Sequence, residues 1–498
     1  MRTIVESFKI QVDERADKRA IIFNGQTITY ADVNRTVNRI ANGLIASGIT
    51  IGDRVLLVMP NVPHFVFSYL AILQAGATVV PVNFLLNDSD LQQIIDKTTP
   101  SAIIVWDRFW PRFRDKRMVF KHIFVHGDQI PQDTKSLSEL ISQSVETETS
   151  IEIKLSERAV IYFTPGVTGL PKGVVLSHKN IAASVKATAR LIQISVDDVF
   201  AGILPFFHVV SQHATVNTAL AYGASVCIYD KSDSEHLQSA LFSDGVTVLG
   251  GSPALFKLLM EQSLPDDKAS TLRFAFSFGD SIEPDIIEKF ENSFKLPMLH
   301  AYNVTEAGGI VSVNRFRPDY KEKTVGIPLD GMNVCIVDDE YVDMRHNKVG
   351  QLLITGDMVT ERYWNDAEAT TSEIHNGWIK TGDFMKIDDE GFLYFLARKD
   401  DVITKSGFQI FPDEVEKVLL LHPKVDQAAV IGISDSRYKQ EVKACVILKA
   451  NESATPDEII EFCKNHIPVY KCPQIVQFYS AFPKSPTGKV LKRILRES

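Results

Sequence analysis

Cysteine is scarce in this chain, and its spacing shows no metal-binding pattern. The five cysteines are Cys227, Cys335, Cys445, Cys463 and Cys472. They form no CxxC pair and no spacing with histidines that is typical of a zinc site. We therefore expect packed, reduced thiols, as is usual in a cytoplasmic protein.

An excess of positive charge is also missing. The 53 Lys and Arg are outnumbered by 62 Asp and Glu, which gives a formal net charge of −9 at pH 7. This balance argues against nonspecific binding to nucleic acid or to anionic membranes, because both are polyanions. We expect no nucleic-acid partner.

Pure apolar runs of membrane-spanning length do not occur. The longest apolar stretch, residues 65–84, contains Gln74, Gly76 and Pro81, whereas a spanning helix needs about 20 predominantly apolar residues. A buried helix followed by a strand fits this stretch better. The charged N-terminal residues 1–20 lack the apolar core and cleavage site of a secretory signal. We expect no transmembrane segment and a cytoplasmic location.

The composition that is present is typical of a globular protein. Apolar residues make up 45% and charged residues 23% of 498 positions, which is too long a chain for one small core. Strand-like residues 53–60 precede helix-like residues 64–76, and Ser252 before Pro253 marks another helix start. This alternation predicts an α/β fold with helix-flanked sheets.

The C-terminal part of the chain has a different pattern. The runs PDEVEKVLLLHP, VDQAAVIGIS, EVKACVILKA and TPDEIIEFCKNH predict helix, strand, strand and helix, and Thr455 has capping-box spacing to Glu458. We expect a large domain at 1–398, a polar hinge at 399–401 and a small α+β domain at 402–498.

A glycine-rich loop, YFTPGVTGLPKGV at 162–174, carries the most distinctive local chemistry. Backbone amides at its glycines and the threonine hydroxyls can donate to phosphate, and its lysine adds a positive charge. The glycine spacing is not that of a Walker A loop, and a surface turn is the alternative for the loop alone. The candidate phosphate-binding residues are Thr164, Gly166, Thr168, Gly169 and Lys172.

Six separated motifs give this loop a context. In chain order they are TYADVNRTVNRIANGL, YFTPGVTGLPKG, LPFFHVVS, YNVTEAG, GWIKTGDFMKIDDEGFLYFLARKDDVITKSGFQIFPDEVE and PKSPTGKVLKR. Together they resemble the adenylate-forming (AMP-binding) superfamily of acyl-CoA synthetases, nonribosomal adenylation domains and luciferases. The resemblance implies a small β-barrel-like subdomain, a mobile C-terminal domain, and activation of a carboxylic acid with ATP and Mg²⁺.

The resemblance also implies roles for the residues near the reacting groups. Lys489 reaches the carboxylate and the α-phosphate, and Thr305 contacts phosphate. Glu306 is the Mg²⁺ ligand, since Mg²⁺ binds one or two carboxylates together with phosphate oxygens. His208 lies beside the substrate carboxylate. Without the resemblance, His208 would read as a packed core residue between apolar neighbours.

Adenine and ribose contacts are implied in the same way. Tyr302 stacks near adenine, and Asn303 replaces a glycine that is usual in the family, in a turn where asparagine tolerates left-handed geometry. Asp383 accepts from both ribose hydroxyls, and Arg398 lies on the ribose side. The adenine segment Gly279, Asp280 and Ser281 departs from the usual Gly-Ala-Pro.

Domain motion and coenzyme A binding are assigned to the segment that follows. Asp400 matches the hinge position about which the small domain rotates between two half-reactions. The residues that would face the coenzyme A thiol channel are Ser406, Gly407 and Phe408.

Two residues of the glycine-rich loop depart from the family pattern. Pro165 replaces a serine and removes a hydroxyl and an amide donor, and Val167 replaces a hydroxyl residue. Each lost donor to a charged phosphate costs roughly 1.5–3 kcal/mol if water does not substitute. We expect a working loop with weaker handling of ATP or pyrophosphate; an inactive homologue is the alternative.

The most economical function is an ATP-dependent acid–CoA ligase that forms an acyl-adenylate and then an acyl-CoA thioester. The apolar runs around LPFFHVV and VLGGSPALF favour a medium- or long-chain fatty acid. Alternatives are a fatty acyl-AMP ligase that delivers to a carrier-protein thiol, an aryl-acid CoA ligase, and a nucleotide-binding pseudoenzyme. The expected partner is a small carboxylic acid, and a homodimer stays an open alternative for the oligomeric state.

Overall fold

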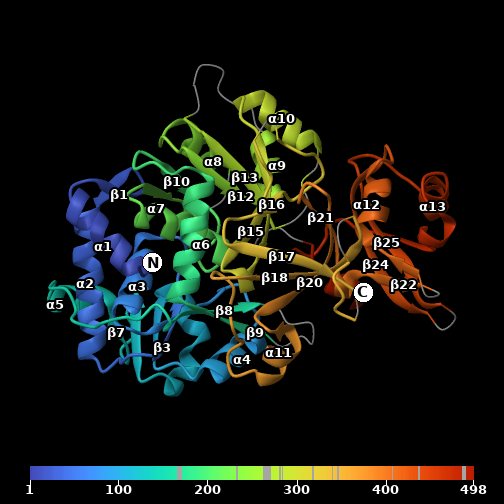
Figure 1. Cartoon of the computed structure of the whole chain (residues 1–498). Helices are drawn as coiled ribbons and strands as arrows, with labels where there is room; N and C mark the ends of the chain where they lie inside the picture. The colour runs from blue at the N-terminus through green and yellow to red at the C-terminus, as the bar shows by residue number, and fades with distance from the viewer. Residues whose placement is uncertain are drawn as a thin grey trace. The chain divides into compact units, whose positions relative to one another are not determined.

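The chain folds into two units, which Figure 1 shows as a computed structural model. Unit 1 comprises 1–321, 326–334 and 354–379, and unit 2 comprises 322–325, 335–353 and 380–498. The structure describes residues 1–164, 171–230, 234–261, 271–279, 282, 284–316, 319–338, 340–344, 347–405, 408–435, 438–484 and 490–497.

The larger sheet of unit 1 has nine strands in the order β16-β15-β14-β13-β12-β10-β11-β1-β2. Its central strands are parallel, and the pairings at its two edges are antiparallel. The bounds are β16 Ile327–Pro328, β15 Gly309–Val313, β14 Met298–Val304, β13 Phe274–Phe278, β12 Val248–Gly251, β10 Val199–Gly202, β11 Ser225–Ile228, β1 Arg19–Phe23 and β2 Gln26–Thr29.

Three helices gather on one side of this sheet: α8 (Ser234–Phe242), α9 (Pro253–Met260) and α10 (Pro284–Phe294) (Figure 1). Their apolar side chains form one core with β10, β12 and β13, in which Leu237, Phe256 and Phe290 are fully buried. Ser252 caps α9 by accepting from the Leu255 amide, and Pro253 occupies the first turn. The predicted helix start is therefore confirmed.

The second sheet of unit 1 has seven strands in the order β7-β6-β5-β3-β4-β8-β9. All its pairings are parallel except that of β8 with β9. The bounds are β7 Lys135–Ser136, β6 His122–His126, β5 Ala102–Trp106, β3 Arg54–Val58, β4 Thr78–Pro81, β8 Arg158–Thr164 and β9 Lys172–Ser177.

The remaining helices of unit 1 follow the predicted alternation with strands. The stretch 65–84 forms a buried helix, α3, followed by β4, as expected. Among the described residues, no helix is both long and apolar enough to cross a bilayer. The bounds are α1 Ile4–Arg15, α2 Tyr30–Ala46, α3 Pro63–Gln74, α4 Asp88–Thr98, α5 Leu137–Gln143, α6 His178–Leu191, α7 Thr218–Ala221 and α11 Ala367–Glu373.

A five-stranded sheet of order β17-β18-β20-β19, with β21 paired to β20, forms the half-barrel that the resemblance implied. The two described pairings, of β19 with β20 and of β20 with β21, are antiparallel. The bounds are β17 Met332–Val337, β18 Val349–Gly356, β19 Ile374–His375, β20 Trp378–Ile387 and β21 Leu393–Arg398.

The C-terminal part of unit 2 is the predicted α+β pattern. A sheet of order β23-β22-β25-β24, with β26 on β25, packs against α12 and α13 around a core that includes Val415, Val430 and Ile459. Thr455 caps α13 by accepting from the Glu458 amide. The bounds are β22 Ile403–Lys405, β23 Phe408–Ile410, α12 Pro412–Leu420, β24 Val425–Asp435, β25 Lys439–Leu448, α13 Pro456–Lys464, β26 Ile475–Phe478 and α14 Lys492–Glu497.

The predicted fold class, α/β with a large N-terminal and a smaller C-terminal part, is confirmed. The domain bounds 1–398, 399–401 and 402–498 stay a prediction, because a hinge is defined by motion.

Candidate functional site

The glycine-rich loop connects two paired strands. Thr164 ends β8 and Lys172 begins β9, and the two residues are direct partners in the antiparallel register. This pairing brings the ends of the loop together at one edge of the seven-stranded sheet. The loop residues Gly166, Thr168 and Gly169, with the departures Pro165 and Val167, lie outside the described residues.

Lys172 is held by groups from a distant part of unit 1. Its ammonium lies 3.3 Å from the Glu373 Oε1 at the end of α11 and 5.6 Å from the centroid of the Tyr363 ring. The Lys172 side chain is only 20% exposed and that of Glu373 is 29% exposed. The Lys172 ammonium therefore lies in a partly buried environment, beside a carboxylate and an aromatic ring.

Thr305 and Glu306 form a short 3₁₀ turn (η4, Thr305–Ala307) directly after β14. The Thr360 amide donates to the Glu306 carbonyl at 2.8 Å. The Tyr363 hydroxyl donates to the Glu306 Oε1 at 3.1 Å. Gly308 ends the turn in the left-handed region, at φ 64°, where glycine carries no steric cost.

The left-handed geometry proposed for Asn303 is wrong. Asn303 lies within β14 and opposes Ile310, next to a register shift between Tyr302 and Asn303, and its φ is not positive. The chain reverses later, at Gly308. Asparagine is therefore accommodated here because an extended strand accepts any side chain, and not because it tolerates a turn.

The predicted adenine residues lie at the carboxyl ends of two neighbouring parallel strands. Register pairs run up to Phe278 with Ala301, so Gly279 and Tyr302 follow at the same edge. Gly279 has φ +97°, and a Cβ built there would meet no atom within 4 Å. Asp280 and Ser281 lie outside the described residues. Carboxyl ends of parallel strands are the usual ligand-binding edge of such a sheet.

His208 lies just before a stretch of π-helix, Ser211–Asn217. Burial lowers the pKa of His208 to about 4, so the ring is neutral near pH 7 and can exchange a hydrogen bond with a carboxylate without adding charge. The Ser211 hydroxyl donates to the Leu204 carbonyl at 2.7 Å, so its proton is already used in a hydrogen bond within the protein.

A second histidine, which the sequence did not single out, connects this helix to the Glu306 turn. The His213 Nδ1 lies 2.8 Å from the Gly308 carbonyl and its Nε2 lies 3.2 Å from the Tyr162 hydroxyl. Because a carbonyl only accepts, Nδ1 carries the proton. Burial lowers the pKa of His213 to about 4, so Nε2 accepts from Tyr162. The sequence carried no signal for this role of His213 beyond the presence of a histidine in a stretch that the fold buries.

The predicted ribose residues meet in unit 2. Asp383 on β20 and Arg398 on β21 are cross-strand partners, with 3.7 Å between the Arg398 Nε and the Asp383 Oδ1. The aspartate side chain is 3% exposed and the arginine side chain 57%. A cationic guanidinium thus lies beside the buried carboxylate, whose oxygens can accept from hydrogen-bond donors.

The hinge candidate Asp400 lies in a 3₁₀ turn (η5, Lys399–Asp401) that α14 contacts. Arg496 donates to the Asp400 carbonyl at 3.1 Å and forms an ion pair with Asp401. Phe408 is 57% exposed, and its ring centroid lies 5.1 Å from that of Tyr470. Ser406, Gly407 and Lys489 lie outside the described residues.

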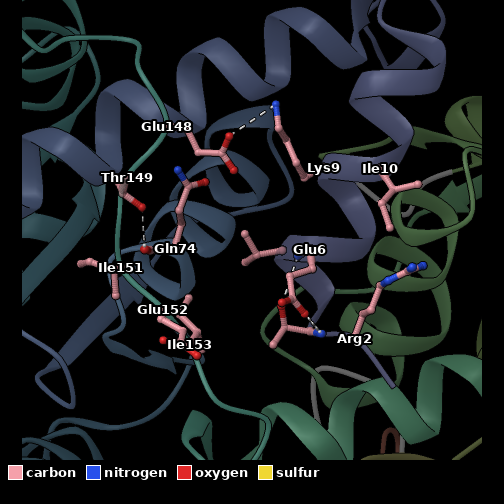
Figure 2. A pocket seen from close by; sticks show the side chains of 12 residues that line it. Arg2, Glu6, Lys9, Ile10, Gln74, Glu148, Thr149, Ile151, Glu152 and Ile153 are labelled. Carbon is pink, nitrogen blue, oxygen red and sulfur yellow. Dashed lines mark hydrogen bonds and ion pairs between the residues drawn. The ribbon is translucent and has the colours of Figure 1, made fainter.

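A surface cavity of about 360 Å³ lies elsewhere in unit 1, between α1 and residues 148–153. Figure 2 shows Lys9 reaching towards Glu148 across it, and the Thr149 hydroxyl donating to the Gln74 carbonyl. None of its lining residues is a predicted site residue. This cavity is therefore separate from the groups described above.

The family comparisons agree with the order of the motifs. Residues 8–364 match the AMP-binding enzyme family, and residues 414–489 match the AMP-binding enzyme C-terminal domain. The chain is 30% identical over 475 residues to the long-chain-fatty-acid–CoA ligase FadD13 of Mycobacterium tuberculosis, covering 94% of this chain and 93% of that protein. It is 28% identical to a long-chain-fatty-acid–CoA ligase of Bacillus subtilis, covering 97% and 92%.

The similarity to solved structures covers nearly the whole chain. ATP-bound MatB from Rhodopseudomonas palustris superposes with a TM-score of 0.90 at 26% identity, covering 99% of this chain and 98% of that one. A benzoate CoA ligase from Burkholderia xenovorans gives a TM-score of 0.89 at 23% identity, covering all of both chains; at that identity the likeness concerns the fold alone.

Proposed function

The chain belongs to the AMP-binding enzyme family and is an AMP-forming acyl-CoA synthetase; from this premise we propose that its acid substrate is a medium- or long-chain fatty acid. The relatives named as long-chain ligases, at 28–30% identity, support this choice. The apolar residues around His208, among them Phe206 and Val209, also support a fatty acid, because an aliphatic chain is best bound by apolar side chains. The enzyme uses ATP, Mg²⁺ and coenzyme A.

One observation carries the nucleotide site: the loop lysine, Lys172, and the carboxylate of Glu306 converge on Tyr363. Transfer of AMP to an acid brings two anions together, so the site has to supply positive charge and hold the triphosphate in line. A lysine at the end of the loop, and a carboxylate for a metal at the end of a strand of the other sheet, are the groups that this task requires.

Glu306 fits the role of the Mg²⁺ ligand. A carboxylate has two oxygens that can accept several bonds, so the hydrogen bond from Tyr363 is compatible with a cation. Mg²⁺ takes few protein ligands and completes its octahedron with phosphate oxygens and water. When bound, the ion would screen the phosphate charges, and Thr305 would contact a phosphate beside it.

The chain's other groups are proposed to position and neutralise the reactants. His208, neutral at pH 7, would orient the acid carboxylate; Lys489 would bring its ammonium to the carboxylate and α-phosphate oxygens. Asp383 and Arg398 would bind the ribose, with Gly279, Asp280, Ser281, Tyr302 and Asn303 around the adenine. Thr164, Gly166, Thr168, Gly169 and Lys172 would cradle the phosphates, Asp400 would be the hinge, and Ser406, Gly407 and Phe408 would face coenzyme A.

The test is formation of AMP by the purified chain, with Mg²⁺ and ATP, across acids of graded length and aromaticity. We expect turnover that requires coenzyme A and is highest for medium or long aliphatic acids. Preference for aromatic acids would make the chain an aryl-acid ligase. If the acyl group of the adenylate is transferred only to a carrier-protein thiol, the chain is an acyl-AMP ligase.

Lys489→Ala tests the proposed adenylation residue. We expect loss of at least about 100-fold in adenylate formation, because the lysine would neutralise both anions in the transition state, while coenzyme A transfer from a supplied acyl-adenylate continues. Adenylate formation at the parental rate would contradict the assignment.

A further inference from the structure

Tyr363 connects two groups of the proposed nucleotide site and has no role in the motifs that led to it. Its hydroxyl donates to the Glu306 Oε1 at 3.1 Å, and its ring lies 5.6 Å from the Lys172 ammonium. Tyr363 is 5% exposed. A single buried side chain therefore contacts both the metal-ligand candidate and the phosphate-binding lysine.

The fold places Tyr363 by main-chain pairing with β9. Tyr363 forms a bridge with Val174, and the Trp364 amide donates to the Gly173 carbonyl at 2.7 Å. A Cβ at Gly173 would lie 3.0 Å from the Trp364 Cβ, so glycine permits this close approach. The Tyr363 amide donates to the Thr370 hydroxyl at 3.0 Å, which connects it to α11.

The same helix supplies a competitor for the lysine. Glu373, the last residue of α11, has its Oε1 3.3 Å from the Lys172 Nζ. Because a lysine ammonium has three donors and no acceptor, it can exchange this carboxylate for a phosphate oxygen. The pair is partly buried, so its attraction is less screened than that of an exposed pair.

We propose that Tyr363 and Glu373 are positioning residues of the nucleotide site: Tyr363 orients the Glu306 carboxylate, and Glu373 holds Lys172 until nucleotide phosphate displaces it. This inference rests on the proposed function. The Tyr363 hydroxyl acts through Glu306 and therefore affects only metal-dependent nucleotide binding. Glu373 acts through Lys172 and therefore opposes nucleotide binding with or without metal.

The experiment is calorimetric titration of the full chain with ATP, once with Mg²⁺ and once with EDTA. For Tyr363→Phe we expect the Kd for ATP with Mg²⁺ to rise about tenfold, since a hydrogen bond to a charged group is lost, and the Kd without Mg²⁺ to stay within about twofold. For Glu373→Gln we expect both Kd values to fall by about threefold, as for loss of a partly exposed ion pair.

Matched controls are Glu368→Gln, an exposed residue on the same helix, and Tyr222→Phe, which is 37% exposed on unit 1. Both are expected to bind as the parent does, and thermal unfolding checks that every variant is folded. A Tyr363→Phe effect that is equal with and without Mg²⁺, or absent, overturns the role of Tyr363. An unchanged or raised Kd in Glu373→Gln overturns that of Glu373.

The outcomes also separate this inference from the proposed function. A parent chain that binds ATP and forms AMP, with variants that bind like it, overturns only the inference. A parent chain that binds no ATP under either condition overturns both.

Discussion

At the scale of single residues, the ribose pair is the best-defined part of the proposed site. Asp383 and Arg398 are direct cross-strand partners, and the aspartate is nearly inaccessible while the arginine is exposed. An adjacent cation and a fixed place in the strand register thus define the position of the carboxylate. Its charge, and not only its shape, should matter for binding.

Asp383→Asn is expected to raise the KM for ATP by roughly 10- to 100-fold, because a hydrogen bond to a charged acceptor contributes about 1.5–3 kcal/mol. Pyrophosphate release at varied ATP measures this. Asp389→Asn, an exposed position on the same hairpin, should leave the KM unchanged. A parental KM in Asp383→Asn would remove the residue from the nucleotide site.

The altered loop makes a second prediction at this scale. The double variant Pro165→Ser, Val167→Thr restores a backbone amide donor and two hydroxyls. If weaker phosphate binding is the consequence of their loss, the KM for ATP should fall about tenfold or more, given roughly 1.5–3 kcal/mol per donor to a charged group. Steady-state kinetics give the value, and an unchanged KM would show that water replaces the missing donors.

At the scale of elements, the N-terminus of α6 fixes the segment that leads to Tyr363. Ser177 and Asn180 form a capping box. The side-chain Nδ2 of Asn180 also donates to the carbonyls of Asp357 and Val359, both at 2.9 Å. The next residue, Thr360, donates its amide to the Glu306 carbonyl. The cap of α6 is therefore connected to the Glu306 turn through residues 357–360.

Asn180→Ala is expected to lower the free energy of unfolding by about 2–3 kcal/mol, because a helix cap is lost and two carbonyls, one buried and one partly buried, lose a donor. Urea unfolding of the full chain measures it. The neighbouring Lys179→Ala removes only an exposed ion pair with Asp357 and should cost less than about 1 kcal/mol. Equal effects of the two substitutions would contradict the role of the cap.

The last helix, α14, is anchored in unit 2 by a largely buried ion pair. The Lys492 Nζ lies 2.6 Å from the Glu416 Oε1, and Glu416 also accepts from the Val430 amide at 2.7 Å. Just before this helix, Lys484 and Val490 form a bridge across residues 485–489. The ion pair therefore fixes one flank of the segment that contains Lys489.

Glu416→Ala is expected to lower the free energy of unfolding by about 3–5 kcal/mol, because it removes the carboxylate of a largely buried ion pair and leaves the other charge in place. The double variant Glu416→Leu, Lys492→Met should be much milder, since apolar residues of similar size fill the space. Urea unfolding followed by far-UV circular dichroism compares the two. A double variant as unstable as Glu416→Ala would show that the charges themselves are required.

At the scale of the whole molecule, buried imidazoles from several elements make stability depend on pH. Burial lowers the pKa of His178, His208 and His213 to about 4 and that of His64 to about 3. In each case the unfolded chain, with a pKa near 6.5, binds a proton that the folded chain does not. Their contribution to stability is complete above pH 6.5 and is lost as the pH falls towards 4.

The free energy of unfolding is therefore expected to fall steeply between pH 6.5 and pH 4, by up to about 3 kcal/mol for each fully buried ring such as His178 or His213. Urea titrations at several pH values measure the slope. His178→Asn, which removes one titrating group, should flatten the curve over this window. An unchanged slope would show that His178 is protonated without cost in the folded chain.

Local patterns in the sequence determined the elements and the family. The buried strand β3, the helix α3 and the caps of α9 and α13 lie where apolar periodicity and capping residues predicted them. These signals are local, since they depend on residues only a few positions apart. The motifs assigned both Asp383 and Arg398 to the ribose, and the two residues lie side by side because both are on one hairpin; their role stays a prediction.

Only the tertiary structure decided which distant residues meet. Tyr363 contacts Lys172 and Glu306 because its segment pairs with β9, almost two hundred residues earlier in the chain. His213 likewise reaches Gly308, which lies 95 residues later. Asn303 was misjudged because the position of the chain reversal depends on how β14 pairs with β15. Propensities act within a few residues, whereas such contacts are selected by the packing of whole sheets and helices against one another.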